Sequence, residues 1–504
     1  MVATFEAMAI ALDSIFVWPT IAFVVIGTLI GMVFGALPGL GGTVALALLI
    51  PITFGMESSW AMVLFGSTLG GVAFGGSISA ILINVPGTGP NAATLLDGYP
   101  MARQGRAGEA LGVSATASAL GAVFGLVILV ALLPVAREII LAFSSPEFFW
   151  LAILGLTIIA VTTHGRLLKG LLAGALGLMF SFIGYNNVTG VYRYGFGTEY
   201  LWDGIELVPA LIGLFAIAEV INLTTRGGTI AEGEVIENRG GVLKGVRYVL
   251  THPSLFVRSS AIGTLIGIIP GAGGTVANFL SYMQAVQTSD DPDSFGTGNP
   301  AGVLASEAAN DSKDGGALLP AVVFGIPGSA AIAVLLGGLI LHGLNPGREL
   351  LNENLPLLFT LIFALLFANI LTSAIGLASA NQVAKLTRVP VQLLTPGILV
   401  VSLVGAFALR NNMGDVVIAV LFGVLGYAMI AFGYSRVAVV IALILGPIAE
   451  KAFLQSQMIS DTGYWFMVSR PISIVLILLT VVSLLLPFMR ARRDGAADLG
   501  GGQI

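Results

Sequence analysis

The sequence predicts an all-α integral membrane protein with about 12 transmembrane helices in two homologous halves, interrupted by broken or re-entrant helices at Pro-Gly motifs. Of 504 residues, 56% are hydrophobic and 10% are charged, against roughly 25% charged in soluble domains. Apolar stretches of about 20 residues, long enough to cross a bilayer, recur along the chain. A Pro-Gly motif occurs twice. These observations leave no room for a large soluble domain.

The repeated motif begins at Gly31 in the first half and at Gly263 in the second. The pattern Gly-x-x-x-Gly-x-x-Pro-Gly-x-Gly-Gly-Thr-Val-Ala matches residue for residue over 31–45 and 263–277. A weaker echo follows, in which Gly75-Gly76 and Val-Pro-Gly-Thr at 85–88 correspond to Gly315-Gly316 and Ile-Pro-Gly-Ser at 326–329. Because the order of the motifs is kept, the sequence predicts an internal duplication.

Polar composition divides the chain. We expect a first membrane repeat over 1–223, a polar linker over 224–253, a second membrane repeat over 254–489 and a polar tail over 490–504. Basic residues in the linker and tail favour the cytoplasm for both, although Arg103 and Arg106 compete for the same side. The relation of the repeats depends on whether segment 43–56, which contains Pro51, crosses the bilayer. Inverted repeats are a common transporter architecture, and we expect them here.

The first Pro-Gly motif of each half is a candidate substrate site. It falls between two apolar stretches, where a break leaves backbone groups without helical partners and must be buried in protein or line a cavity. Glycine permits positive φ, and the N–H groups that open the next helix attract a carboxylate. The Gly-x-x-x-Gly parts are better explained as helix-packing faces. The candidate substrate-binding residues are Pro38, Gly39, Gly41, Gly42, Thr43, Pro270, Gly271, Gly273, Gly274, Thr275 and, one turn later, Asn278.

The second motif of each half is a further predicted break. In each half a Pro-Gly pair precedes a hydroxyl residue, an arrangement that ends one helix and starts another. A plain proline kink is the alternative. The candidate substrate-binding residues here are Asn84, Pro86, Gly87, Thr88, Pro327, Gly328 and Ser329.

The run 306–316 is the most unusual polar segment of the second half. It is either a solvated loop or a segment that dips toward the motifs. In the second case Glu307, Asn310 and Asp311 supply oxygen ligands for a coupling Na⁺, or a carboxylate carries a coupling H⁺. Lys313 would pair with these residues or with an anionic substrate. The first half has no equivalent charges, and no other cofactor or metal is expected.

Enzymatic functions are disfavoured. The chain has no Cys, its three His residues are scattered, and it has no Gly-x-x-x-x-Gly-Lys-Ser/Thr phosphate loop. The formal net charge of −5 gives no sign of a nucleic-acid partner. The same broken helices would serve a carrier or, alternatively, an anion-selective channel-like pore.

The paired motifs at 37–43 and 269–275, with Asn84 to Thr88, Leu96 to Pro100, Gly325 to Ser329 and Leu339 to Pro346, resemble the large membrane subunit of the tripartite tricarboxylate transporters. The resemblance covers about Val17 to Pro487. It implies a multi-pass permease of the bacterial inner membrane that takes up citrate or related organic acids on an ion gradient. It also implies two partners, a small membrane subunit and a periplasmic solute-binding protein.

Overall fold

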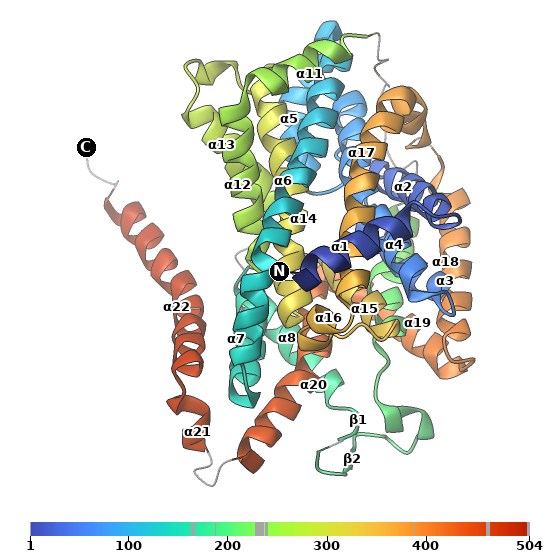
Figure 1. The fold of residues 1–504 in the computed structure, drawn as a ribbon, viewed down its shortest axis with the longest axis vertical. Coiled ribbons are helices and arrows are strands. Elements are labelled where there is room, and N and C mark those ends of the chain that lie inside the picture. The colour runs from blue at the N-terminus through green and yellow to red at the C-terminus, as the bar shows by residue number, and fades with distance from the viewer. Residues whose placement is uncertain are drawn as a thin grey trace. The chain divides into compact units, whose positions relative to one another are not determined.

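The computed structural model describes residues 2–162, 167–186, 188–226, 236, 240–387, 389–459 and 464–500, most of them helical (Figure 1). The chain divides into two compact units. Unit 1 contains 1–137, 208–323 and 327–427, and unit 2 contains 138–207, 324–326 and 428–504. All the candidate site residues of the sequence belong to unit 1.

The described part of unit 1 consists of helices and the turns between them. Short π-helical stretches at Ala102–Arg106 and Ile212–Ile217 link α5 to α6 and α9 to α10, and a 3₁₀ turn at Pro292–Ser294 precedes α14. Its helices are α1 (Val2–Ile15), α2 (Thr20–Ala36), α3 (Gly41–Thr53), α4 (Ser58–Ile83), α5 (Asn91–Met101), α6 (Ala107–Ala142), α9 (Leu207–Leu211), α10 (Ala218–Arg226), α11 (Val242–Thr251), α12 (Pro253–Ile268), α13 (Gly273–Gln287), α14 (Pro300–Phe324), α15 (Ala330–Leu341), α16 (Arg348–Asn352), α17 (Leu355–Leu386), α18 (Val391–Ala408) and α19 (Met413–Phe432). The first residue of α9 and the last residues of α6, α14 and α19 belong to unit 2.

Unit 2 combines apolar helices with a small hairpin. Its antiparallel strands β1 (Gly184–Tyr185) and β2 (Tyr192–Arg193) are followed by a 3₁₀ turn at Glu199–Asp203. The Arg193 guanidinium forms an ion pair with the Glu450 carboxylate and so ties the hairpin to α20. The helices are α7 (Ser145–Thr162), α8 (Leu167–Ser181), α20 (Arg436–Ile459), α21 (Tyr464–Ser469) and α22 (Pro471–Gly500).

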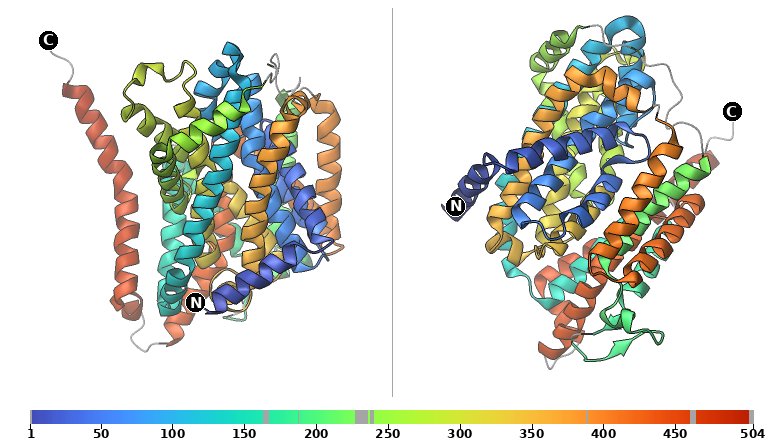
Figure 2. Two further views of the ribbon diagram at one scale, coloured as in Figure 1. Left: turned by 45° about the horizontal axis from the view of Figure 1, so that its top comes forward. Right: turned by 90° about the vertical axis from the view of Figure 1, so that its right-hand side faces the viewer.

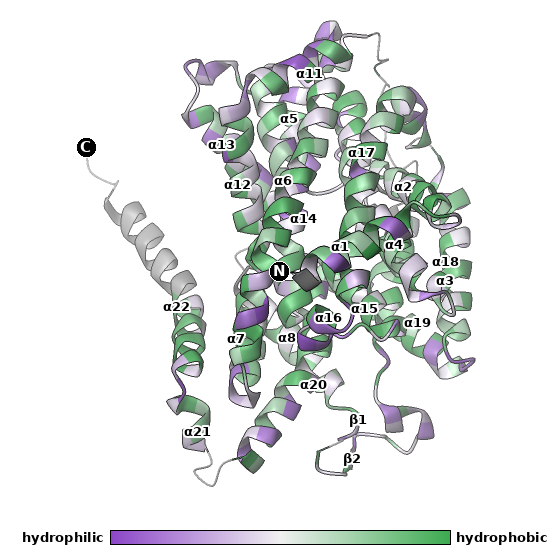
Figure 3. Ribbon diagram, viewed as in Figure 1, coloured by the Kyte–Doolittle hydropathy of each residue, from purple (hydrophilic) through white to green (hydrophobic). Residues whose placement is uncertain are grey.

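The described helices show a multi-pass membrane protein. Seven are long and apolar enough to cross a membrane, or eight if the bent pair α1 and α2 forms one span. Apolar residues predominate along α4, α17 and α18 (Figure 3). Six more apolar helices are shorter, at 10–17 residues. A total of 12 spans requires these shorter helices to cross in combination, so that number and the inverted relation of the repeats stay predictions.

The repeat seen in the sequence has a structural counterpart in two sets of glycine contacts. A Cβ atom on any of these glycines would lie within 3 Å of a neighbouring helix, so the backbones themselves touch. In the first repeat the contacts are Gly31 with Thr68, Gly35 with Val72, Gly75 with Met32 and Gly87 with Gly35. In the second repeat they are Gly263 with Ala309, Gly267 with Lys313, Gly316 with Thr264 and Gly328 with Gly267.

These contacts fix the register of the weaker echo. Gly75 and Gly316 occupy the same place, because each packs on the equivalent residue of the preceding long helix. Gly76 therefore corresponds to Ala317, and pairing Gly75-Gly76 with Gly315-Gly316 is wrong by one residue. The interpretation of the Gly-x-x-x-Gly segments as packing faces is confirmed, since both press on the backbone of α4 or α14.

A long helix from each half of the chain packs against the other half. Helix α17 of the second half packs along α4 of the first, where a Cβ on Gly66 would lie 2.5 Å from the Leu361 carbonyl oxygen. Helix α6 of the first half packs along α14 of the second, where a Cβ on Gly125 would lie 2.3 Å from the Ser312 carbonyl oxygen. Figure 2 shows α1, α2 and α4, in blue, beside α17. The repeats therefore share one interior.

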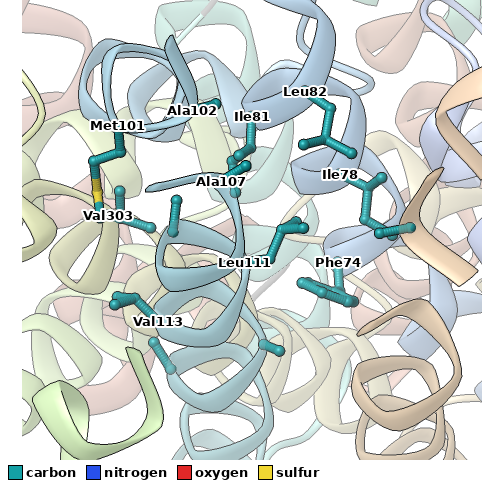
Figure 4. Close-up of a cluster of buried hydrophobic side chains, with 14 of the residues drawn as sticks. Phe74, Ile78, Ile81, Leu82, Met101, Ala102, Ala107, Leu111, Val113 and Val303 are labelled. Carbon is teal, nitrogen blue, oxygen red and sulfur yellow. The ribbon is translucent and has the colours of Figure 1, made fainter. Parts of the chain in front are cut away.

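An apolar cluster surrounds these contacts (Figure 4). It joins Phe74 and Ile78 of α4 to Met101 of α5, Leu111 of α6 and Val303 of α14, all fully buried. Since the same four helices carry the polar site described below, the cluster fixes their relative positions. Of the predicted linker, 227–235 and 237–239 lie outside the described residues, as does the end of the predicted tail after 500.

Candidate functional site

Both predicted Pro-Gly breaks have the backbone that their glycines indicate. Gly39 and Gly41 have φ values of 88° and 55°, and Gly271 and Gly273 have 75° and 70°. This left-handed region is readily accessible only to glycine. The breaks lie after α2 and α12, of 17 and 16 residues, and before α3 and α13, of 13 and 15 residues, which are about 20 Å long at 1.5 Å per residue. These short helices are half-spans, too short to cross a hydrocarbon core of about 30 Å alone.

The second breaks also correspond to one another. Asn84 caps the end of α4 with φ 63°, and Gly325 has φ 72° at the end of α14. The following short helices differ in how they begin. Ser329 caps α15 by accepting a hydrogen bond from the Ile332 N–H at 3.3 Å, whereas the Thr88 N–H donates to the Asn91 side chain at 3.2 Å.

Contacts bring three of the four breaks together. A Cβ on Gly41 would lie 3.6 Å from the Thr88 methyl group, and one on Gly89 would lie 2.7 Å from the Thr275 hydroxyl oxygen. The Asn278 amide donates to the Pro90 carbonyl at 3.0 Å. We call the residues 39–43, 86–91 and 271–278 the motif cluster. It places the start of α3 and α13 close to the second break of the first half.

The fourth break is joined to the cluster through its helix. Helix α15 contacts α3, and its end is linked to α3 by a 3.1 Å contact between the His342 ring and the Thr53 hydroxyl. Helix α5 contacts α13 in the same way. Each short helix after a first break thus lies beside the short helix after a second break of the other repeat. Gly328 itself packs against Gly267 and Ala317, and Pro327 beside it is buried.

The polar run of the second half is helical and buried. Residues 306–314 lie inside α14, and Ser306, Glu307, Asn310, Asp311 and Ser312 are at most 1% exposed. The interpretation as a solvated loop is therefore wrong. Neighbouring helices supply partners for these side chains that the linear sequence does not show.

Glu307 is the best-satisfied charge of this run. The Ser77 hydroxyl of α4 lies 2.8 Å from both of its carboxylate oxygens. The Thr94 hydroxyl of α5 and the Ser118 hydroxyl of α6 also donate to it, the latter at 3.0 Å. The Asn91 amide donates to Ser77 at 2.8 Å, which links Glu307 to the second break. Glu307 thus joins three helices of the first half.

Asp311 lies one turn further along α14 and is not satisfied in this way. Both of its carboxylate oxygens are buried, and neither accepts a hydrogen bond of normal geometry from the described residues. Three further buried groups have no hydrogen-bond partner among the described residues. They are the Asn310 amide nitrogen, the Ser114 hydroxyl oxygen and the Asn278 amide oxygen. Buried unpaired polar atoms are costly, so a set of them indicates an interior that binds something polar.

A second buried carboxylate ties the repeats together. One oxygen of Asp97 accepts hydrogen bonds from the N–H groups of Gly296, Gly298 and Asn299 at 2.8–2.9 Å. The other accepts from the Tyr282 hydroxyl at 2.8 Å. Asp97 is fully buried and fixes α5 to α13 and to the loop before α14. Its partners are those of a structural carboxylate.

Sequence reasoning did not identify Ser77, Thr94, Ser118 or Asp97 as interior partners. It also missed Glu219, a buried carboxylate of α10 that lies against Gly39. One available signal is the pair Ser114 and Ser118, spaced one turn apart in a largely apolar helix. Single hydroxyls in apolar spans usually bond to their own backbone, as Thr28 does, so the signal is weak.

Broken-helix repeats around a buried, charged interior helix define a multi-pass membrane protein of the kind that moves polar solutes. The family is shown by sequence comparison. The chain belongs to the Tripartite tricarboxylate transporter TctA family, whose family model matches residues 21–441. This is a transporter family, and the resemblance stated from the motifs is confirmed.

Two relatives from Agrobacterium vitis match the chain. One is the "Uncharacterized 52.8 kDa protein in TAR-I ttuC' 3'region", 32% identical over 473 residues, which cover 93% of this chain and 94% of the relative. The other is the "Uncharacterized protein in TAR-II ttuC' 3'region", 30% identical over 235 residues, 46% of this chain and 97% of the relative. No solved structure matches.

Proposed function

We propose that this protein is the large subunit of a binding-protein-dependent system that takes up tricarboxylates such as citrate, or related organic acids, on an ion gradient. The observation that carries the proposal is the buried pair Glu307 and Asp311, one turn apart on α14 beside the motif cluster. Two interior carboxylates in a membrane protein indicate a cation or proton pathway.

The motif cluster is the proposed substrate site. The helices that begin at Gly41 and Gly273 direct their free N–H groups toward the breaks, where a carboxylate is stabilised by the helix dipole. Thr43 and Thr275 add hydroxyl donors, and Asn278 adds a buried amide. The Thr88 hydroxyl donates to the Asn91 side-chain oxygen, so its contact with substrate requires that bond to open. Ser329 serves first as a helix cap, so its contact with substrate requires the cap to open.

Glu307, Asn310 and Asp311 are the proposed coupling-ion site. Together with the hydroxyls of Ser77, Thr94 and Ser118 they form an all-oxygen ligand set, the donor type that a hard cation prefers. A proton on either carboxylate is the alternative coupling ion. Because α4, α5 and α6 belong to the first half and α14 to the second, occupation of this site would stabilise one arrangement of the two repeats.

The wider assembly follows from family membership. We propose that the protein works in the bacterial inner membrane with a small membrane subunit and a periplasmic solute-binding protein. The repeats, taken as inverted, would rock around the motif cluster to expose it alternately to each side. The partners named here are those implied by a tripartite system.

Reconstituted uptake tests the proposal. The full chain and its two partner subunits are placed in proteoliposomes, and radiolabelled citrate uptake is measured with Na⁺ and pH gradients imposed separately. Saturable uptake that requires one gradient, together with counterflow exchange, supports a coupled carrier. Citrate flux without saturation or counterflow would indicate the channel-like alternative. Absence of flux for citrate and for a panel of di- and tricarboxylates would refute the proposed substrate class.

A further inference from the structure

Lys313 lies directly against the Pro-Gly motif of the second half. A Cβ atom on Gly274 would be 2.2 Å from the Lys313 Cε atom and 2.7 Å from the Pro90 side chain. The methylene stem of Lys313 therefore runs across the start of α13, between two breaks of the motif cluster. Only 14% of its side chain is exposed.

The equivalent place in the first repeat is apolar. Gly42 corresponds to Gly274, and a Cβ on Gly42 would lie 3.2 Å from a methyl group of Val72. Val72 and Lys313 are equivalent, because Gly35 and Gly267 pack on their respective carbonyl groups. Packing at this place needs only a side chain of moderate size, and valine meets that need. The ammonium group of Lys313 requires a separate explanation.

The ion-pair partner of Lys313 is Asp314, its neighbour in the chain, and this geometry is unfavourable in a helix. The Lys313 ammonium is 2.7 Å from a carboxylate oxygen of Asp314, the next residue in the chain. Successive residues of a helix point in different directions and do not normally face one another. The pair therefore requires both side chains to bend around α14. A carboxylate that approached Lys313 from the motif cluster would not need this bend.

We infer that the Lys313 ammonium binds a carboxylate of the transported substrate, and that Asp314 is its counter-ion in the substrate-free protein. The inference rests on the proposed carboxylate transport and adds to it a cationic ligand and an internal competitor. Substrate binding exchanges one ion pair for another, so Lys313 is never left as an unpaired buried charge. The released Asp314 carboxylate, 8% exposed, then joins Glu307 and Asp311 on α14 and increases the attraction of that helix for cations.

Two single variants with opposite expected effects test this inference. In the reconstituted system, Lys313→Gln should raise the KM for citrate by about 10- to 100-fold, the value of one charge-assisted hydrogen bond. Asp314→Asn should lower the KM by about 3-fold, because it removes the competitor of the substrate. Lys385→Gln, at an exposed lysine in the last turn of α17, is the control.

The double variant gives a second readout. In a Lys313→Gln background, Asp314→Asn should leave the KM for citrate unchanged, since Asp314 affects citrate binding only by competing for Lys313. If both single variants raise the KM, or if both leave it at the wild-type value, the inference is wrong and the ion pair is structural. If Lys313→Gln does not fold, the direction of the Asp314→Asn effect still decides. Failure of the wild-type protein to transport any carboxylate would instead contradict the proposed function itself.

Discussion

Helices α4 and α14 occupy equivalent places in the two repeats but carry different side chains toward their partner helices. Both touch a preceding helix through glycines and end at a left-handed residue before a Pro-Gly break. On α4, Gly66 and Gly70 press against the backbone of α17. On α14 the same places hold Glu307 and Asp311.

Helix α14 also packs closely on its partner helix, α6, but the small residues that permit this lie on the partner. There the glycines lie mainly on the partner helix, at Gly121 and Gly125 of α6, which touch the carbonyl groups of Ala308 and Ser312. Moving the small residues to the partner leaves two places on α14 free for carboxylates. The comparison teaches that the duplication preserves backbone contacts, while the side-chain chemistry of the two copies is independent.

The largest expected effect breaks the equivalence of the two motif glycines. Gly274→Val should abolish citrate uptake, because its side chain must displace Lys313 and Pro90. Gly42→Val should impair uptake less, since its nearest neighbour, Val72, is 3.2 Å from the new Cβ. Uptake per molecule of membrane-inserted protein, measured by quantitative blotting of proteoliposomes, is the readout. Normal uptake by both variants would remove the motif cluster as the substrate site.

The next effect concerns the charge that distinguishes α14 from α4. Glu307→Gln keeps the volume of the side chain but removes its charge. Gradient-driven uptake should fall roughly 100-fold, because the hydrogen bonds that Ser77, Thr94 and Ser118 donate to the charged carboxylate are worth about 3 kcal/mol more than those to a neutral amide. Counterflow exchange at equal ion concentrations should fall less. Glu353→Gln, at an exposed carboxylate, is the control. Uptake by Glu307→Gln that still follows the ion gradient would exclude Glu307 from coupling.

The smallest effect concerns the hydrogen bonds that Asp97 accepts from the loop before α14. The equivalent residue of the second repeat is Gly338, which packs on Phe65. Asp97→Ala leaves three backbone N–H groups without their acceptor. Hydrogen exchange at Gly296, Gly298 and Asn299 should become about 10- to 100-fold faster, as expected for a loss of roughly 1.5–3 kcal/mol. Tyr282→Phe removes only one bond and should accelerate exchange less. Unchanged exchange in the alanine variant would show that the loop is held by other contacts.

The breaks and their pairing could be predicted from the sequence, because glycine and proline determine backbone conformation locally. The positive φ values at Gly39, Gly41, Gly271 and Gly273 follow directly from the motif. The polar run at 306–316 also stands out in the sequence, because its charged and amide residues interrupt an apolar chain. Its helical, buried state could not be predicted, because that state depends on Ser77, Thr94 and Ser118, which come from three distant helices.

The number of spans was harder to predict than the motifs. Hydropathy counts apolar stretches, and it does not distinguish a half-span such as α3 from a full span such as α4. It also passes over α14, whose carboxylates lower its apolar character although its surroundings are buried. The helices that matter most for the proposed chemistry are therefore the ones that a hydropathy search finds least easily.

The packing of α17 on α4 and of α6 on α14 also determines when each half can complete its contacts during synthesis. When α4 leaves the ribosome, its partner α17 has not yet been made, and Gly66 and Gly70 have no backbone to press against. Helix α6 likewise waits for α14. The first half must therefore enter the bilayer with its small-residue faces turned to lipid or to an assembly factor. Packing is completed only when the second half arrives, so a pause in translation between the halves would prolong the stage most open to mispairing.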